Sequence, residues 1–221
     1  MSTILLGVTG SVAAVRTPEL FAALNAAGHE VHIVATEASL YFFDRTALPP
    51  DALTTDADEW PGERYVRGDP VPHIELRRRA DLFLIAPLDA NTLAKLAVGL
   101  CDNALTCVWR AWDMTKPVIV APAMNTLMWQ HPFTRKHLRT VAADFGATHV
   151  PGHLTDDLLL QQINDRAKNF RIVGPIRKTL ACGDDGIGAM AEVADLAAAA
   201  TRMLAESGSF LPHVQLNEPK A

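Results

Sequence analysis

The sequence predicts a doubly wound parallel α/β sheet with helices on both faces, a three-layer α/β/α fold. Short apolar runs alternate with segments of helical spacing along the chain, and no internal repeat interrupts them. The 221 residues suffice for one domain with a full core, and 49% apolar and 20% charged residues are ordinary for a globular protein. We therefore expect one domain over residues 1–205 and a flexible tail over residues 206–221.

Charge and composition exclude several classes of function. A net charge of -5 gives no indication of a nucleic-acid partner. No apolar run is long enough to span a bilayer, and the first residues lack the pattern of a signal peptide. Three cysteines, Cys101, Cys107 and Cys182, make a poor disulfide framework. We expect a cytoplasmic protein with free thiols, no membrane contact and no metal site.

The stretch Ala80–Asn103 is the one around which the chain is organised. Leu82–Ala86 is a short apolar run, typical of a strand buried on both faces, and Pro87 is expected to end it. Small and polar residues then open a segment of helical spacing: Asp89, Ala90, Asn91 and Thr92. Because ligands of open α/β sheets bind outside the carboxyl ends of strands, these four residues are candidate ligand contacts.

The first strand–turn–helix unit is a second candidate site. Ile4–Val8 is expected to be a buried strand, and helical spacing follows it until Gly28, a good helix stop. Between them, Gly10, Ser11 and Val12 form a turn in which backbone N–H groups can approach an anion. The alternative is a plain turn that needs a flexible glycine. The later glycines of a dinucleotide fingerprint are missing.

The second strand is expected over Glu30–Ala35. Thr36 and Ser39 follow it and are candidate contacts at the strand ends, although simple helix capping is the alternative for Thr36. Residues 44–72 show no clear period and form a surface connection, part of which is expected to pack locally or against another subunit. A short helix over 73–80 then begins with His73, which alone would be a surface or packing residue.

The remaining elements continue the alternation. Helices are expected over 103–112, 132–145 and 192–205, and strands over 117–121 and 148–150. Asn125 follows the strand 117–121 and is a further candidate ligand contact. Residues 152–175 are polar and are interpreted as an excursion out of the core with a short helix over 158–163. Residues 178–190 are expected to be a mobile, glycine-rich loop in which Cys182 is a reactive thiol.

Three motifs now stand together: Gly10–Ala14, Ala86–Thr92 and Pro122–Trp129. With His73 and the loop that holds Cys182, they resemble the homo-oligomeric flavin-containing cysteine decarboxylases over nearly the whole chain. The resemblance implies a flavodoxin-like fold, bound FMN, and a homotrimer with the FMN near the subunit interface. It also implies a mobile substrate flap over about 152–191.

The resemblance further implies roles for individual residues. His73 would be the catalytic base across the interface, Asn125 would bind the substrate carboxylate, and Cys182 would be the final proton donor. FMN contacts would come from Gly10, Ser11, Val12, Thr36, Ser39, Asp89, Ala90, Asn91, Thr92 and Met124. Substrate contacts would add Met128, Thr179, Leu180 and Ala181.

The chemistry implied is decarboxylation of 4'-phosphopantothenoylcysteine to 4'-phosphopantetheine in coenzyme A biosynthesis. Oxidation of the thiol-bearing carbon by the flavin places a C=S group next to the carbon that loses CO2, so that sulfur accepts the electron pair. The enethiol is then reduced again and protonated. Histidine suits removal of the thiol proton, and an asparagine binds the carboxylate without adding a positive charge.

Three alternatives stay open. An oxidative peptidyl-cysteine decarboxylase would stop at the enethiol and would not need Cys182 or its loop. A non-catalytic regulatory relative that binds a protein phosphatase would often lack part of the set His73, Asn125 and Cys182, which is complete here. An FMN electron-transfer protein would need neither Asn125 nor the cysteine loop.

Overall fold

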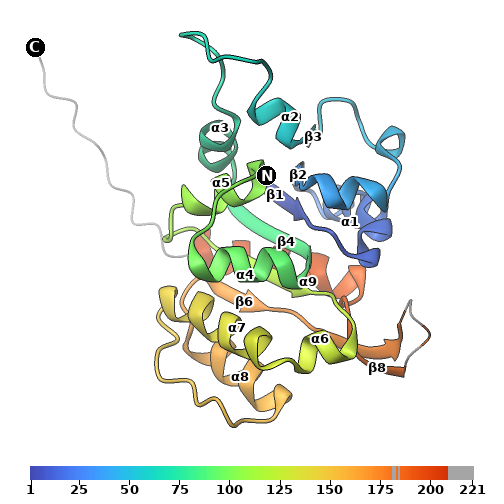
Figure 1. Cartoon of the computed structure of the whole chain (residues 1–221), viewed down its shortest axis with the longest axis vertical. Coiled ribbons are helices and arrows are strands. Elements are labelled where there is room, and N and C mark those ends of the chain that lie inside the picture. Colours follow the sequence, from blue (N-terminus) through green and yellow to red (C-terminus); the bar gives the residue numbers. More distant parts are fainter. Residues whose placement is uncertain (181–182, 184, 209–221) are drawn as a thin grey trace, which may run out of the picture.

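The computed structural model describes residues 1–180, 183 and 185–208, and it confirms the three-layer α/β/α fold (Figure 1). The main sheet is parallel and has the strand order β3-β2-β1-β4-β5-β6. The order β2-β1-β4-β5-β6 is that of flavodoxin-like folds, and β3 extends it at one edge. The strands are β1 (Thr3–Val8), β2 (Glu30–Ala35), β3 (Leu53–Thr54), β4 (Leu82–Leu88), β5 (Val118–Pro122) and β6 (Phe170–Ile172).

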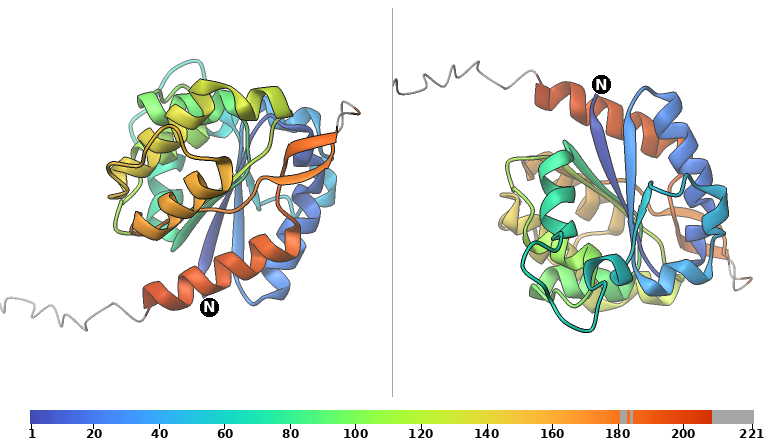
Figure 2. Two further views of the ribbon diagram at one scale, coloured as in Figure 1. Left: turned by 90° about the horizontal axis from the view of Figure 1, so that it is seen from below. Right: turned by 90° about the horizontal axis from the view of Figure 1, so that it is seen from above.

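Helices cover both faces of this sheet (Figure 2). One face packs against α1 (Thr17–Ala26) and α9 (Val193–Gly208). The other packs against α3 (Pro72–Arg79), α4 (Ala90–Val98), α5 (Ala104–Arg110), α7 (Pro132–Asp144) and α8 (Asp156–Arg166). The short helical elements are η1 (Val12–Arg16), η2 (Glu37–Tyr41), η3 (Arg45–Ala47), α2 (Asp56–Glu59) and α6 (Thr126–Gln130).

The alternation of side chains along each strand explains the two cores. Ile4 and Leu6 of β1 lie in the cluster with α1 and α9, whereas Leu5 lies in the cluster of the opposite face. In β4, Leu84 lies in the cluster with α1 and α9, and Ile85 lies in the cluster of the opposite face. Burial of each such side chain stabilises the fold by about 1.5–3 kcal/mol, so a strand apolar on both faces is fixed in the middle of the sheet.

The expectation that Pro87 ends the strand was wrong. The strand β4 continues to Leu88, which pairs with Pro122 after the register shifts beyond Ile85. Proline lacks the N–H group that a regular ladder needs, so the strand passes through it at an irregularity rather than stopping.

The expected fifth strand over 148–150 was also wrong. Those residues form a turn, and His149 has a φ of +61° that a strand does not accommodate. The strand next to β5 is β6, within the segment that we interpreted as an excursion from the core. Leu159 and Ile163 of α8 are fully buried. The segment 156–172 therefore belongs to the main fold, whereas β7 (Ile176–Thr179) and β8 (Asp185–Ala189), which follow it, form a separate two-stranded sheet.

The surface connection 44–72 contains the edge strand β3 and the helix α2, so part of it packs locally, as expected. The segment 178–190, expected to be a loop, is mostly an antiparallel hairpin of β7 (Ile176–Thr179) and β8 (Asp185–Ala189). The last helix, α9, continues to Gly208 rather than ending at 205, and the rest of the predicted tail lies outside the described residues. Among the described residues, no helix combines the length and apolar character needed to cross a membrane.

Candidate functional site

The carboxyl end of β1 leads into a tight turn at Gly10 and Ser11. Gly10 leaves no room for a side chain, because a Cβ there would lie 2.8 Å from the Cβ of Ala38. The Oγ of Ser11 accepts a hydrogen bond from the backbone N–H of Ala13 (3.4 Å) and thereby caps η1. A ligand beyond β1 can therefore approach the backbone itself at this turn.

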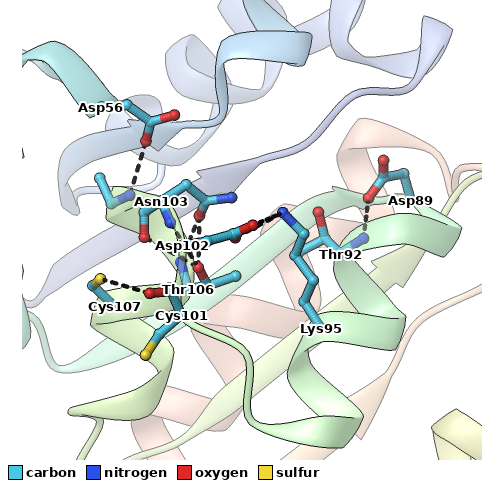
Figure 3. Close-up of polar contacts among 10 residues, drawn as sticks. Asp56, Asp89, Thr92, Lys95, Cys101, Asp102, Asn103, Thr106 and Cys107 are labelled. Carbon is cyan, nitrogen blue, oxygen red and sulfur yellow. Dashed lines mark hydrogen bonds and ion pairs between the residues drawn. The ribbon is translucent and has the colours of Figure 1, made fainter.

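The end of β4 is tied to the end of β1 by the hydroxyl of Thr9. Its Oγ1 donates to the carbonyl of Pro87 (2.8 Å) and accepts from the backbone N–H of Asp89 (2.8 Å), and Thr9 is fully buried. Asp89 then caps α4, because its Oδ1 accepts from the N–H of Thr92 (2.8 Å; Figure 3). The two strand ends are therefore joined by a satisfied polar network.

Asn125 follows β5 and caps α6. Its Oδ1 accepts from the backbone N–H of Met128 (2.8 Å), whereas its Nδ2 makes no hydrogen bond to another described residue. The helix is fixed in turn by Trp129, a buried side chain whose indole N–H donates to Asp156 of α8 (2.9 Å). The two amide hydrogens of Asn125 are thus available to an acceptor on a ligand.

The hairpin β7–β8 lies against the start of α6, and two glycines make this approach possible. A Cβ on Gly188 would overlap the carbonyl oxygen of Met124, and a Cβ on Gly186 would overlap the hydroxyl of Thr126. Gly188 also has a φ of +148°, and its carbonyl accepts the N–H of Met124 (2.9 Å). Only glycine allows the hairpin to lie this close to the end of β5.

These strand ends and the hairpin enclose an open cleft of about 620 Å³. Its volume is within the range of about 300–1,000 Å³ that small-molecule and cofactor sites occupy. Eleven of the predicted site residues line it: Gly10, Ser11, Val12, Asp89, Ala90, Asn91, Met124, Asn125, Met128, Thr179 and Leu180. The structure therefore brings the three sequence motifs to one place.

A charged cluster that sequence reasoning missed lies at the base of the hairpin. Arg16 donates to Glu19 (3.0 Å) and Glu192 (2.7 Å), and Lys178 donates to Glu192 (3.3 Å). Arg16, and after it Lys178, hold the pKa of the Glu192 carboxyl below its usual range. Both cations line the cleft, as does Phe42. Nothing local in the sequence shows that residues so far apart along the chain would meet.

Three of the predicted FMN contacts do not line the cleft. Thr36, Ser39 and Thr92 are buried, and the first two donate their hydroxyls to the carbonyls of Val8 (3.5 Å) and Thr36 (2.7 Å). These bonds support the turn after β2. A contact of these residues with a flavin stays a prediction.

His73 also lies away from the cleft, on α3, which sits on the other side of the molecule from the hairpin (Figures 1 and 2). Its partner is Glu59, a buried residue that the sequence analysis did not single out. The pattern Thr55-Asp56-Ala57-Asp58, typical of a capped helix start, was the only local signal near it.

The remaining site residues, Ala181 and Cys182, lie outside the described residues. Within the described ranges, no cluster of histidine, cysteine and carboxylate side chains could hold a metal ion.

Comparison with known proteins agrees with the fold. The model of the Flavoprotein family matches residues 1–205. The chain belongs to the Flavoprotein family. Phosphopantothenoylcysteine decarboxylase from Oryza sativa subsp. japonica is 50% identical to this Flavoprotein chain over 190 residues, which are 86% of the chain and 74% of the rice protein.

Solved structures of similar sequence have the same fold. A mutant PPC decarboxylase complexed with pantothenoylaminoethenethiol superposes with a TM-score of 0.74 at 45% identity, covering 93% of this chain and 98% of that one. The FMN binding protein AtHal3 superposes with a TM-score of 0.72 at 46% identity, covering 93% and 97%. The flavodoxin-like architecture of this Flavoprotein chain is therefore shared with close relatives along nearly its whole length.

Proposed function

We propose that this protein is an FMN-dependent decarboxylase that converts 4'-phosphopantothenoylcysteine into 4'-phosphopantetheine in coenzyme A biosynthesis. One observation carries the proposal: a single cleft is lined by the turn at Gly10, the start of α4 and Asn125, the three motifs on which the resemblance rests. The rice relative that bears the name of this activity supports it.

The residues of the cleft fit a flavin mononucleotide. The space beside Gly10 would be filled by any side chain at that position, because a Cβ there would contact Ala38. The start of α4 supplies backbone N–H groups and the positive end of a helix dipole. Apolar side chains such as Val12, Met124 and Met128 line the same cleft and suit a planar ring system. We assign the phosphate and ribityl chain to the first turn and the ring system to the start of α4.

Bound FMN supplies a hydride acceptor for the thiol-bearing carbon of the substrate. His73 takes the thiol proton, and the free amide hydrogens of Asn125 bind the substrate carboxylate. Because the amide is neutral, it orients the carboxylate with less stabilisation of the charge that must disappear than a cationic side chain would give. Cys182 supplies the proton that ends the reaction, and Thr179 and Leu180, at the end of β7, hold the substrate together with Ala181. We propose that the hairpin of β7 and β8 is the substrate flap.

We further propose that the protein is a homotrimer in which His73 reaches the cleft of a neighbouring subunit. The position of α3 supports this, because His73 does not line the cleft of its own chain. Mixing His73→Asn and Asn125→Asp chains tests it at a substrate concentration far below KM, where both parent variants have little activity and each supplies what the other lacks. Reassembled trimers should recover about a quarter of the wild-type activity. If trimers that are shown to contain both kinds of chain recover no activity, each complete site lies within one chain, and the proposal is wrong.

We also propose a cytoplasmic location. Two of the three cysteines, Cys101 and Cys107, are free thiols in the structure, as expected in a reducing compartment.

The first experiment is an anaerobic incubation of the purified protein with 4'-phosphopantothenoylcysteine, followed by visible absorbance and mass spectrometry. A yellow protein and a product lighter by one CO2 are expected. A product lighter by two further hydrogens would identify the oxidative peptidyl-cysteine type of chemistry instead. A colourless, inert protein would contradict the proposal and favour a regulatory relative.

A further inference from the structure

His73 and Glu59 form a polar pair that the roles assigned so far leave unexplained. Both carboxylate oxygens of Glu59 are occupied by His73: Oε2 accepts from its backbone N–H (3.0 Å), and Oε1 is in a short contact with the ring Nδ1. The side chain of Glu59 is only 5% exposed, and that of His73 24%. A carboxylate so far from water needs a partner for its charge, so the two side chains behave as one unit.

The helix α2 that carries Glu59 is pinned at several points. Thr55 and Asp58 form a capping box at its start, with the Thr55 N–H donating to Oδ2 of Asp58 (2.7 Å). Asp56 accepts the N–H of Ala104 at the start of α5 (2.8 Å; Figure 3). The helix cannot rotate without breaking these bonds, so the direction of the Glu59 carboxylate is fixed.

The helix α3, which carries His73, is also held in place by hydrogen bonds. The Nζ of Lys116 donates to the carbonyls of Arg77 (3.1 Å) and Ala80 (2.7 Å) and thereby caps the carboxyl end of α3. Cys107 of α5 lies in the same region: burial, and after it the charge of Glu59, raises the pKa of its thiol to about 11. The thiol stays neutral near pH 7 and donates to the carbonyl of Cys101 (3.7 Å) rather than to Glu59, so His73 remains the partner of the carboxylate.

We propose that Glu59 is a positioning residue for His73, an inference that rests on the proposed role of His73 as base. An ionised carboxylate only accepts hydrogen bonds, so it selects the tautomer with the proton on Nδ1 and leaves the lone pair on Nε2. The substrate S–H proton then moves to Nε2, and Glu59 stabilises the imidazolium that forms. The competing explanation is that Glu59 merely caps α3 through the backbone N–H of His73.

Kinetics of Glu59→Gln separate these explanations. The glutamine keeps the shape and can still accept the backbone N–H, but its amide N–H disfavours a proton on Nδ1. We expect kcat of Glu59→Gln to fall at least about tenfold, and KM to change less than about threefold. The largest possible loss of kcat is that in His73→Asn, which is about 10²–10⁴-fold. Glu75→Gln, on the exposed side of α3, is the matched control and should change neither constant. A wild-type kcat in Glu59→Gln would overturn the proposal.

A double variant provides the second kinetic test. Added to His73→Asn, Glu59→Gln should cause no further loss, because Glu59 acts only through the ring. A further loss equal to that in the wild-type background would show that Glu59 acts independently, as a structural cap would.

The tautomer can be measured without any turnover. In the holoenzyme labelled with 15N-histidine, the His73 signals are those missing from His73→Asn, and at a pH where the ring is neutral they should show the Nδ1–H form. A neutral ring protonated on Nε2 would contradict the proposal, even where Glu59→Gln does not fold. If the wild type fails to decarboxylate the substrate, the proposed function fails while this measurement still decides the role of Glu59.

Discussion

The two halves of the proposed site are held in place in different ways. At the strand ends, Ser11, Asp89 and Asn125 each accept a backbone N–H only two or three residues further along the chain. His73, by contrast, depends on Glu59, 14 residues earlier and on another helix. The caps at the strand ends are thus encoded locally. The half that holds the base depends on tertiary packing and lies away from the cleft.

The largest expected effect comes from His73→Asn, which removes the base and leaves the cleft intact. Turnover should fall by about 10²–10⁴-fold, the contribution of general base catalysis, while FMN stays bound. Asparagine can still donate a hydrogen bond to Glu59, which limits the cost to the fold. Steady-state assays and the flavin absorbance of the purified variant measure both. His153→Asn, an exposed position, is the control. Substantial turnover in His73→Asn would remove this residue from the mechanism.

Asn125→Asp should weaken substrate binding without changing the stability of the fold. An aspartate caps α6 equally well through the N–H of Met128. Its negative charge repels the substrate carboxylate, so KM should rise by about 10- to 100-fold. Thermal unfolding should be unchanged. Asn25→Asp on the exposed side of α1 serves as the control, and an unchanged KM in Asn125→Asp would separate this residue from substrate binding.

Gly188→Ala tests whether the hairpin needs its close contact with Met124. A side chain there overlaps the carbonyl of Met124 and strains a backbone with a φ of +148°. A cost of about 1–3 kcal/mol should raise the population of the detached hairpin about 5- to 150-fold. Limited proteolysis within 176–189 measures it. Gly62→Ala is the matched control, because the nearest atom to its Cβ would be 3.8 Å away. Equal proteolysis of both variants would refute the steric argument.

The smallest effect concerns Cys107, whose thiol reports on the charge of Glu59. Because its pKa is raised to about 11, alkylation should be slow at neutral pH and should accelerate about tenfold per pH unit towards that value. Glu59→Gln removes a negative charge that disfavours the thiolate, so the pKa should fall and alkylation at a given pH should become faster. Peptide mass mapping, with the exposed Cys101 as internal standard, detects the change. An unchanged ratio of the two rates would show that the carboxylate charge does not reach Cys107.

The sequence predicted the central strands well, because burial on both faces leaves a continuous apolar run. The strand Glu30–Ala35 has the predicted bounds. Those of β1 and β4 differ by one or two residues at one end, and those of β5 by one residue at each end. The cleft residues were equally accessible to sequence reasoning. Asp89 and Asn125 follow such runs directly, and parallel strands end at the same edge of the sheet.

The parts that the sequence did not reveal depend on contacts between distant segments. β6 has only three residues and follows Asn169, whose φ is +53°, so no apolar pattern separates it from a loop. The tripeptide Thr148–Val150 looked more strand-like, because its backbone angles are invisible in the sequence. β3 has two residues and exists only through pairing with β2. Glu59 likewise carries no local signal of its partner, since nothing before α3 indicates which residue will face His73.

The hydroxyl of Thr9 affects how fast the backbone amide of Asp89, in the cleft, exchanges with solvent deuterium. The N–H of Asp89 donates to Thr9 Oγ1, a fully buried group between the two central strands. Exchange of this amide requires its bond to the Thr9 hydroxyl to open, and the burial of Thr9 between the two strand ends resists that opening. Although Asp89 lines the cleft, its amide should therefore be among the slowest to exchange. In hydrogen–deuterium exchange, the rate of this amide would be an internal reference for opening at the strand ends, with which the faster exchange of the hairpin amides could be compared.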